Sequence, residues 1–539
     1  MGPMLGGPVL DVDEVREAIG PVLADESIEK IGQNIKYDIL VLRHAGFELR
    51  GPLMDTMVAA HVMDSTRRSL KMDSLARDLL NHECIPIDQL IGTGKNQLSM
   101  NEVPVDVVAK YAAEDADVTF RLAEVLRSQL QQAGMDELFA DLEMPLLPVL
   151  ADMEYEGITV DPERLKEMEV ELSRRSDELR DRIIDLAGRP FNVDSPKQLA
   201  TVMFDELGMR VIKKTKSGPS TDSFVLSELA IEHELPALVL DYRKLTKLLG
   251  TYLKALGECI HPETHRVHTS FNQAGTATGR LSSSDPNLQN IPVRTEEGRR
   301  IRSAFVAKPG CVLLSADYSQ VELRMLAHFC QDPTMVAAFE AGQDIHRTVA
   351  AEVFGVPVGE VTGEQRSRAK TVNFGIVYGQ TEWGLAATLR ISRTDAREFI
   401  TAYKARFPKI DEYLRQIVQV AKQRGYVETI FGRRRFISGL NARGPARSAA
   451  ERLAINSTVQ GSAADLIKQA MVNISGRIKS ENRPTRMLLQ IHDELVCEVP
   501  EDAVETEKQF IVNEMAGAID LRVPLKVDVG VGTNWMDAK

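Results

Sequence analysis

The pattern of hydrophobic and polar positions changes twice along the chain. Residues 1 to about 140 combine helical periodicity with short apolar stretches, which predicts an α/β unit. Residues 144 to about 256 are charged with helical periodicity, and this predicts two long helices over 162–186 and 235–256. From His265 onward, apolar runs of strand length alternate with segments rich in Asn, Gln, Ser, Thr and Arg. The whole therefore predicts an α+β, multidomain protein.

Shorter signals complete this picture. A helix is predicted to begin near Asp13. The Lys, Gly, Ser and Pro residues of 213–223 predict a mobile loop between the two long helices. The acidic segment from Glu501 predicts a helix, and 523–531 predicts a closing strand. At roughly 150 residues per domain, 539 residues indicate three or four domains, and 43% hydrophobic content is enough to bury their cores.

The chain carries no signal for a membrane or an oxidising compartment. No apolar run approaches the roughly 18 residues of a spanning helix, and the first residues lack the pattern of a signal peptide. The cysteines are odd in number, scattered and without a C-x-x-C pair, at Cys84, Cys259, Cys311, Cys330 and Cys497. We therefore expect a protein of the reducing cytoplasm.

The overall charge conceals an uneven distribution. The net charge of -13 argues against a nucleic-acid partner, yet residues 1–250 carry -17 and residues 251–500 carry +8. Residues 430–454 contain a single acid, Glu451, and six arginines, namely Arg433, Arg434, Arg435, Arg443, Arg447 and Arg452. This stretch predicts a phosphate-binding surface, with an ordinary solvated basic face as the alternative.

Two apolar runs lead to carboxylates. Residues 312–316 have the length of a buried strand and deliver Asp317 to its end. Residues 487–497 form two apolar runs that meet at Asp493 and Glu494, which predicts a hairpin with a polar tip. Either feature alone is commonplace. Together, two strands ending in aspartate could hold two magnesium ions about 4 Å apart, the arrangement used in phosphoryl transfer.

A predicted helix supplies groups that suit a nucleoside triphosphate. A capping box opens the helix at Thr362, and Arg366, Lys370, Phe374 and Tyr378 follow at intervals of four. They form a stripe about 18 Å long, with the cations near the positive end of the helix. Phosphates would meet the cations, and sugar and base would meet the aromatic rings. The alternative is two core aromatics with two solvated cations.

One further segment, 277–292, contains many amides and hydroxyls around Arg280. Such groups suit hydrogen bonds to sugars, phosphates and minor-groove base edges, and a turn-rich loop is the alternative.

Together these motifs resemble those of family A DNA polymerases, from about Lys30 to Lys539. The resemblance is carried by DYSQVELR at 317–324, RSRAKTVNFGIVYG at 366–379 and IHDE at 491–494, in the order of the three polymerase motifs of that family. ATGRLSSSDPNLQNIP at 277–292 and RLAINSTVQG at 452–461 are similar to two template-primer motifs.

The resemblance implies a right-hand polymerase with palm, fingers and thumb, preceded by an incomplete ribonuclease H-like 3'-5' exonuclease-type α/β domain. It places this truncated exonuclease-like domain at 1–140 and the thumb at 141–265. The fingers would occupy 335–435, and the palm would comprise 266–334 and 436–539.

The resemblance also implies catalytic roles. Asp317 and Asp493, with the carbonyl of Tyr318, would hold two Mg²⁺ ions, for which Mn²⁺ could substitute. Glu494 would lie beside them, and Lys370 would donate a proton to the departing pyrophosphate.

Further positions are implied for binding. Glu322 is similar to the steric gate of the family, which fills the space that a ribonucleotide 2'-hydroxyl would need. The nucleotide-binding positions are Gln320, Glu322, His346, Arg366, Lys370, Phe374 and Tyr378. The primer-template positions are Arg280, Asn287, Gln289, Arg452, Asn456, Gln460 and His492.

The beginning of the chain departs from the family. Asp38, Tyr111 and Asp115 resemble residues of the second and third 3'-5' exonuclease motifs, but no Asp-x-Glu of the first motif occurs upstream of Asp38. Asp11 and Asp13 lie too close to Asp38, and we interpret them as helix-capping residues. We therefore expect a vestigial exonuclease site and little or no proofreading.

The expected partners are primer-template DNA and deoxynucleoside triphosphates, with no membrane and a monomeric state. Three alternatives remain open: a 3'-5' exonuclease, a catalytically silent DNA-binding clamp, and a single-subunit RNA polymerase of related fold. The absent acidic motif weakens the first. The second leaves Asp317 and Asp493 without a role, and Glu322 speaks against the third.

Overall fold

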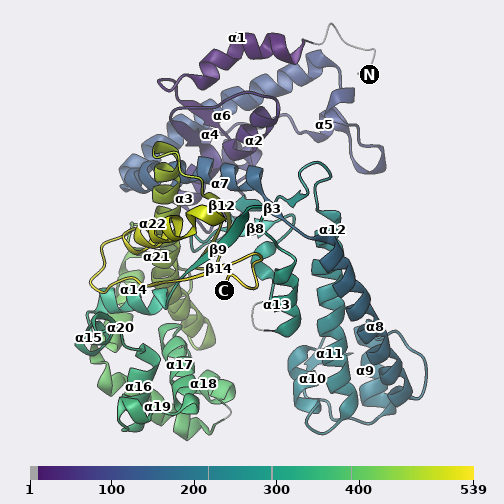
Figure 1. Ribbon diagram of the computed structural model, residues 1–539, viewed down its shortest axis with the longest axis vertical. Helices are drawn as coiled ribbons and strands as arrows, with labels where there is room; N and C mark the ends of the chain where they lie inside the picture. The colour runs from purple at the N-terminus through teal and green to yellow at the C-terminus, as the bar shows by residue number, and fades with distance from the viewer. Residues whose placement is uncertain (1–9, 217, 293–294, 390) are drawn as a thin grey trace.

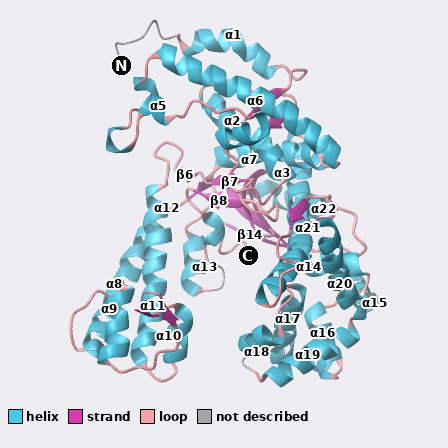
Figure 2. Ribbon diagram, turned by 180° about the vertical axis from the view of Figure 1, so that it is seen from behind, coloured by secondary structure: helices cyan, strands magenta, loops and turns pink. Residues whose placement is uncertain are grey.

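A computed structural model describes residues 10–216, 218–292, 295–389 and 391–539. The N-terminal unit lies at one end, a central sheet lies below it, and two helical arms extend from the sheet on the side away from that unit (Figure 1). The reverse view shows the same arrangement (Figure 2). The observed mixture of helices and sheet agrees with the predicted α+β multidomain fold.

The central sheet has four antiparallel strands in the order β12-β13-β9-β14. Their bounds are Cys311–Tyr318 for β9, Arg486–Ile491 for β12, Glu494–Pro500 for β13 and Val527–Gly532 for β14. In this register Glu494 and Asp528 lie on either side of Asp317. The closing strand was predicted over 523–531 but begins only at Val527, because Pro524 has no N–H for a ladder.

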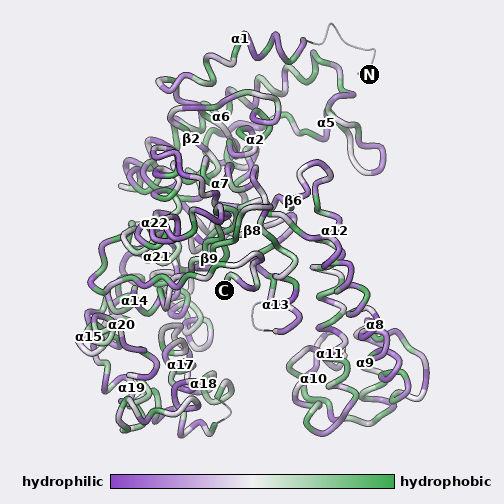
Figure 3. Tube along the Cα trace, in the orientation of Figure 1, coloured by the Kyte–Doolittle hydropathy of each residue, from purple (hydrophilic) through white to green (hydrophobic). Residues whose placement is uncertain are grey.

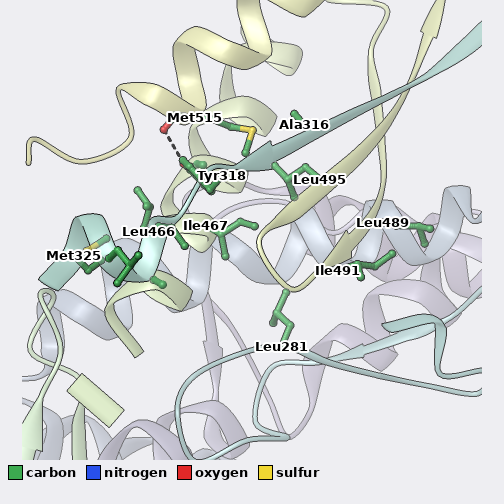
Figure 4. Close-up of a cluster of buried hydrophobic side chains, with 14 of the residues drawn as sticks. Leu281, Ala316, Tyr318, Met325, Leu466, Ile467, Leu489, Ile491, Leu495 and Met515 are labelled. Carbon is green, nitrogen blue, oxygen red and sulfur yellow. Dashed lines mark hydrogen bonds between the residues drawn. The ribbon is translucent and has the colours of Figure 1, made fainter. Parts of the chain in front are cut away.

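Apolar side chains fix the sheet against helices. The tube through β9 is largely hydrophobic in Figure 3. Helices α21 (Pro445–Ser480) and α22 (Val504–Ala516) pack against the sheet region and contribute Leu466, Ile467 and Met515 to its core (Figure 4). The Tyr318 hydroxyl donates to the carbonyl oxygen of Met515 at 2.7 Å, so the end of β9 is tied to α22.

One arm lies beside α21 and follows β9 in the chain. Its elements are α14 Val321–Cys330, α15 Pro333–Glu340, α16 Ile345–Phe354, η7 Val358–Glu360, α17 Gly363–Val377, α18 Glu382–Leu389, α19 Arg393–Arg406, α20 Pro408–Arg424, β10 Tyr426–Glu428 and β11 Arg434–Phe436.

The predicted capping box at the start of α17 is confirmed. The Gln365 amide donates to the Thr362 hydroxyl at 3.2 Å, and the Thr362 amide donates to the Gln365 side chain at 2.9 Å. The helix ends one residue before Tyr378, because Gly379 takes a φ of +64°. The periodicity predicts Tyr378 on the helix, but Tyr378 lies in the turn that follows it.

The other arm contains the two predicted long helices. The first is α8 (Pro162–Ala187), close to its predicted bounds. The second divides into α11 (Glu234–Leu248), a π-helical turn η5 (Leu249–Lys254) and α12 (Ala255–Glu258). The predicted loop 213–223 contains a short hairpin. The remaining elements are α9 Pro196–Ala200, η4 Thr201–Glu206, β4 Lys214–Thr215, β5 Gly218–Pro219 and α10 Ser223–Leu229.

Short elements join this arm to the sheet. They are β3 Ile158–Thr159, β6 Arg266–Val267, β7 Ser270–Asn272, β8 Ser282–Ser284, η6 Leu288–Asn290 and α13 Glu296–Ser303.

The N-terminal unit is an α/β unit with very little sheet. Its strands β1 (Lys30–Gly32) and β2 (Leu53–Asp55) form a two-stranded parallel pair. The first helix begins at Val12. Asp11 caps it by accepting from the Asp13 amide at 2.8 Å, which confirms the capping role predicted for Asp11. The other elements are α2 Ile35–His44, α3 Thr56–Met63, α4 Met72–Leu80, α5 Asp88–Ile91, η1 Gly94–Asn96, η2 Met100–Glu102, α6 Val105–Ala133, η3 Leu138–Glu143 and α7 Met144–Glu156.

A buried charge network connects this unit to the central region. Glu143 accepts hydrogen bonds from Arg433, from Lys468 at 2.7 Å and from Gln273. Asp465 accepts from the Arg433 guanidinium at 2.8 Å. Burial alone would raise the pKa of Glu143, but Arg433 and Lys468 outweigh it and lower the pKa strongly. The four charged groups balance, and this allows them to be buried.

We expect Glu143→Gln to destabilise the protein markedly. The substitution leaves Arg433 and Lys468 facing one carboxylate, and breaking a buried ion pair typically costs about 3–5 kcal/mol of the free energy of unfolding. Denaturant unfolding measures this loss. The matched control is Glu178→Gln, which removes an exposed helical pair with Arg174 and should cost less than about 0.5 kcal/mol. Equal effects of the two substitutions would contradict the prediction.

Candidate active site

Two aspartates predicted from separate motifs meet at one end of the sheet. Asp317 is the penultimate residue of β9, and Asp493 lies in the turn between β12 and β13. The turn closes because His492 adopts a φ of +57°. The Tyr318 amide donates to the carbonyl oxygen of Asp493 at 3.1 Å, and this bond holds the turn against the end of β9. Both carboxylates therefore belong to one site.

The electrostatics of this site suit a cation. Burial raises the pKa of Asp493 to about 6, Arg280 opposes this shift, and the charges of Glu322 and Asp317 add to it. Burial also raises the pKa of Asp317. A raised pKa means that nearby positive charge does not fully offset the cost of burying the ionised carboxylate. A bound cation would provide that positive charge. We therefore expect metal affinity to weaken as the pH falls through about 6, because Asp493 takes up a proton there.

The carboxylates of this site suit a magnesium ion that takes its other ligands from substrate and water better than a metal ion held by protein side chains alone. Among the described residues, no group of three or more His, Cys, Asp or Glu side chains is arranged to hold a metal ion. Magnesium is commonly held by one or two carboxylates together with substrate phosphates and water. Asp317 and Asp493 supply such carboxylates, and the carbonyl of Tyr318 lies in the same stretch of β9.

Glu494 has a different position from the predicted polar tip. It is the first residue of β13, and its side chain is only 3% exposed. Its Oε1 accepts from the Ser315 hydroxyl at 2.7 Å and from the Trp535 indole at 2.8 Å, while Oε2 accepts from Lys539 at 2.8 Å. Burial would raise the pKa of Glu494, but Lys539 and these hydrogen bonds lower it. Glu494 is therefore an ionised, fully bonded carboxylate beneath the two aspartates.

Glu322 lies in the first turn of α14 and is held from two sides. Its Oε1 accepts from the Arg280 guanidinium at 2.7 Å, and its Oε2 accepts from the Tyr378 hydroxyl. The side chain is 8% exposed. Burial and the charge of Glu322 raise the pKa of Tyr378 above its ordinary value. Three residues from separate motifs thus form one hydrogen-bonded group beside Asp493.

Helix α17 presents the predicted phosphate-binding cations. The Arg366 guanidinium pairs with Asp344 at 2.5 Å, and Lys370 is exposed on the same helix. His346, predicted to bind nucleotide, is buried, and its Nδ1 lies 3.0 Å from the Asn373 side-chain amide. Burial lowers the pKa of His346 to about 4. His346 is therefore neutral at physiological pH. The side chain of Phe374 lies outside the described residues.

The predicted primer-template residues lie on three neighbouring segments. Arg452, Asn456 and Gln460 recur every fourth residue of α21 and so share one helix face. Buried Asn456 Oδ1 has no hydrogen-bond partner among the described residues. Gln289 donates to the Gln490 side chain at 3.1 Å, and Asn287, two residues before Gln289, is exposed. The residues that line one pocket include Arg280, Gln289, His492 and Asp493. Gln320 is partly exposed and directly precedes α14, with a φ of +55°.

The predicted arginine surface over 430–454 is partly wrong. Arg433 is buried in the charge network with Glu143 and Asp465. Arg447 pairs with Glu451 at 2.8 Å, and Arg434 pairs with Glu428 at 3.0 Å. A count of charges along this segment could not reveal the burial of Arg433, because Glu143 and Asp465 are distant from it in sequence.

The exonuclease-like residues lie on two helices of the N-terminal unit. Asp38 lies on α2, and Tyr111 and Asp115 lie on α6, where a Tyr111–Asp115 hydrogen bond opposes the rise that burial causes in the pKa of Asp115. Asp55, which belongs to none of the predicted motifs, is fully buried. Its carboxylate accepts four backbone amides at the starts of α2 and α3, so it is a capping residue.

The central sheet with its two helical arms agrees with the fold that the motifs imply, and comparisons with known proteins identify the family. Residues 162–537 match the model of DNA polymerase family A, and residues 9–131 match that of a 3'-5' exonuclease. The chain belongs to DNA polymerase family A.

Individual relatives agree with this assignment. DNA polymerase I of Pseudomonas aeruginosa is 46% identical over 98% of this chain and 59% of its own length. DNA polymerase I of Geobacillus stearothermophilus is 44% identical over 96% of this chain and 59% of its own length. The chain thus spans little more than half the length of these relatives.

A solved structure is also similar. The POL domain of Pol1 from M. smegmatis, in complex with DNA primer-template and dNTP, has a TM-score of 0.90 and 38% identity over 97% of this chain and 89% of its own. None of the described helices is long and apolar enough to cross a membrane.

Proposed function

We propose that the protein carries out template-directed DNA synthesis, adding deoxynucleotides to a primer 3'-hydroxyl with release of pyrophosphate. The observation that carries the proposal is the meeting of Asp317 and Asp493 at one end of the sheet, tied by the hydrogen bond from the Tyr318 amide to Asp493. The family supports the same chemistry. We propose that the protein acts as a monomer in the cytoplasm.

In this proposal Asp317, Asp493 and the Tyr318 carbonyl would hold two magnesium ions. The chemistry such ions would supply there is activation of the primer hydroxyl and stabilisation of the leaving oxygen. The hydroxyl gives up its proton to water as its oxygen forms a bond to the α-phosphorus, the bond from that phosphorus to the bridging oxygen breaks, and pyrophosphate leaves. Arg366 binds the triphosphate, and Lys370 protonates the pyrophosphate. Arg280, Asn456 and Gln460 hold the primer-template.

His346 has a modified role in this scheme. Because it is buried, neutral and bonded to Asn373, it would position α17 and approach phosphate only if the helix moved. A neutral imidazole contributes a hydrogen bond and no charge to phosphate binding.

We further propose that the N-terminal unit does not proofread. Asp38 lies on α2 and Asp115 on α6, and among the described residues neither belongs to a group of three or more His, Cys, Asp or Glu side chains that could hold a metal ion. Without an Asp-x-Glu upstream of Asp38, this unit would lack half of the carboxylates that the resemblance implies for a two-metal nuclease site.

We expect Asp115→Ala to leave primer degradation unchanged, at the background found without metal. Incubation of a 5'-labelled primer with magnesium and no nucleotide measures this directly. Metal-dependent shortening that disappears in Asp115→Ala would show that proofreading exists.

The test of the proposed function is extension of a 5'-labelled primer on a longer template, with magnesium and with or without the four deoxynucleotides. We expect full-length product with nucleotides and an intact primer without them. An unchanged primer in both lanes would support the silent clamp, and shortening without nucleotides would support the exonuclease.

A further inference from the structure

The environment of Glu494 contains a lysine that no motif predicts. The Lys539 ammonium donates to Glu494 Oε2 at 2.8 Å and lies 4.0 Å from Asp317 Oδ2. It is therefore a positive charge placed between the buried glutamate and one of the two proposed metal-binding aspartates. Figure 1 places this end of the chain close to β9 and β14.

The lysine is held in place by buried structure. Trp535 and Ala538 are both fully buried, and the Trp535 amide donates to the carbonyl oxygen of Phe305 at 2.9 Å. The segment also needs two glycines of β14. A Cβ on Gly530 would lie 2.2 Å from the Ala538 carbonyl oxygen, and a Cβ on Gly532 would lie 2.8 Å from the Ala538 amide nitrogen. Lys539 thus follows a closely packed segment.

Glu494 is suited to hold this lysine and poorly suited to bind metal. Its Oε1 already accepts two hydrogen bonds, from Ser315 and Trp535, and Oε2 accepts from Lys539. Arg302 lies 3.7 Å from Oε2 and stacks on the Trp535 ring, with its charge 3.8 Å from the ring centroid. A divalent ion could reach Glu494 only by displacing a cation.

We propose that Lys539 is a resident cation of the active site, which Glu494 positions against Asp317 and which competes with the divalent metal for that carboxylate. This inference rests on the proposed function. The charge of Lys539 offsets part of the cost of burying the ionised Asp317 carboxylate in the metal-free protein. Because like charges repel at this distance, metal binding at Asp317 works against the ammonium group.

Metal affinity of the whole protein tests the inference without catalysis. Titration with Mn²⁺ alone, followed by the electron paramagnetic resonance of the free ion, gives the dissociation constant. We expect Lys539→Met to bind Mn²⁺ about tenfold more tightly than the unsubstituted protein, since the competing charge is gone. Lys539→Arg keeps the charge and should differ little.

A matched control separates this local effect from net charge. Lys526→Met removes the same charge from a lysine that is 65% exposed and pairs with Asp528 at 3.2 Å, and it should leave Mn²⁺ affinity unchanged. Equal or weaker binding by Lys539→Met would overturn the inference, whereas tighter binding by Lys526→Met would reduce it to a net-charge effect and overturn it as well.

The outcomes distinguish this inference from the proposed function. If Mn²⁺ binds and Asp317→Asn abolishes the binding while Lys539→Met does not strengthen it, only the role of Lys539 is wrong. If Asp317→Asn leaves Mn²⁺ binding intact, both the metal site and the resident cation are wrong. Unfolding midpoints of the Lys539 variants identify any loss due to misfolding, and Lys539→Gln, which also removes the charge, repeats the test if Lys539→Met misfolds.

Discussion

Replacement of either aspartate, as Asp317→Asn or Asp493→Asn, is expected to reduce the rate of primer extension by roughly a thousandfold or more. Each substitution keeps the size of the side chain and removes the charge that would hold a metal ion. The effect should appear in kcat more than in KM for the nucleotide, because the lost interaction stabilises the transition state. Single-turnover incorporation of one nucleotide measures it.

The sheet offers a matched control for this prediction. Asp528 lies opposite Asp317 on β14, is 59% exposed and pairs with Lys526. Asp528→Asn removes the same charge close to the site but from a side chain with no proposed role, and it should change the rate by less than about tenfold. Comparable losses in Asp317→Asn and Asp528→Asn would indicate a general field effect and contradict the proposed metal site.

The second large effect is expected in sugar selection. Glu322 is fixed by Arg280 and by the Tyr378 hydroxyl, so its carboxylate cannot easily move away from an incoming 2'-hydroxyl. Glu322→Ala should lower the preference for a deoxynucleotide over the matching ribonucleotide by roughly 100-fold. The ratio of kcat/KM for dCTP and CTP opposite a template guanine measures this preference.

The variant Glu322→Gln separates size from charge. It retains the volume of the side chain and one acceptor, so discrimination should stay within about tenfold of that of the unsubstituted protein. If Glu322→Ala discriminates as well as Glu322→Gln, then Glu322 is not the steric gate.

Much of the fold follows from local pattern. The apolar run of 312–316 became β9, the runs around Asp493 became a β-hairpin, and 162–186 became most of α8. These signals are strong because each segment keeps one periodicity over its whole length. Two of the errors lie at the ends of elements, where a single residue stops the pattern: Gly379 ends α17 before Tyr378, and Pro524 delays the start of β14.

Site residues that belong to a motif could be predicted from the sequence. Contacts between residues far apart in the sequence could not. The aspartate pair and the cations of α17 were identified from their segments. The partners of Glu494 were not, because Ser315 and Lys539 lie far from it in sequence and carry no motif. Arg433 was misassigned to a surface for the same reason, since Glu143 is 290 residues away.

The most direct test of the central claim is incorporation of a single nucleotide on four templates that differ only in the base opposite the insertion position. With magnesium and one deoxynucleotide at a time, we expect each template to accept its complementary nucleotide and to reject the other three, with Asp493→Asn inactive on all four. Extension that ignores the template base, or full activity in Asp493→Asn, would contradict template-directed synthesis at this site.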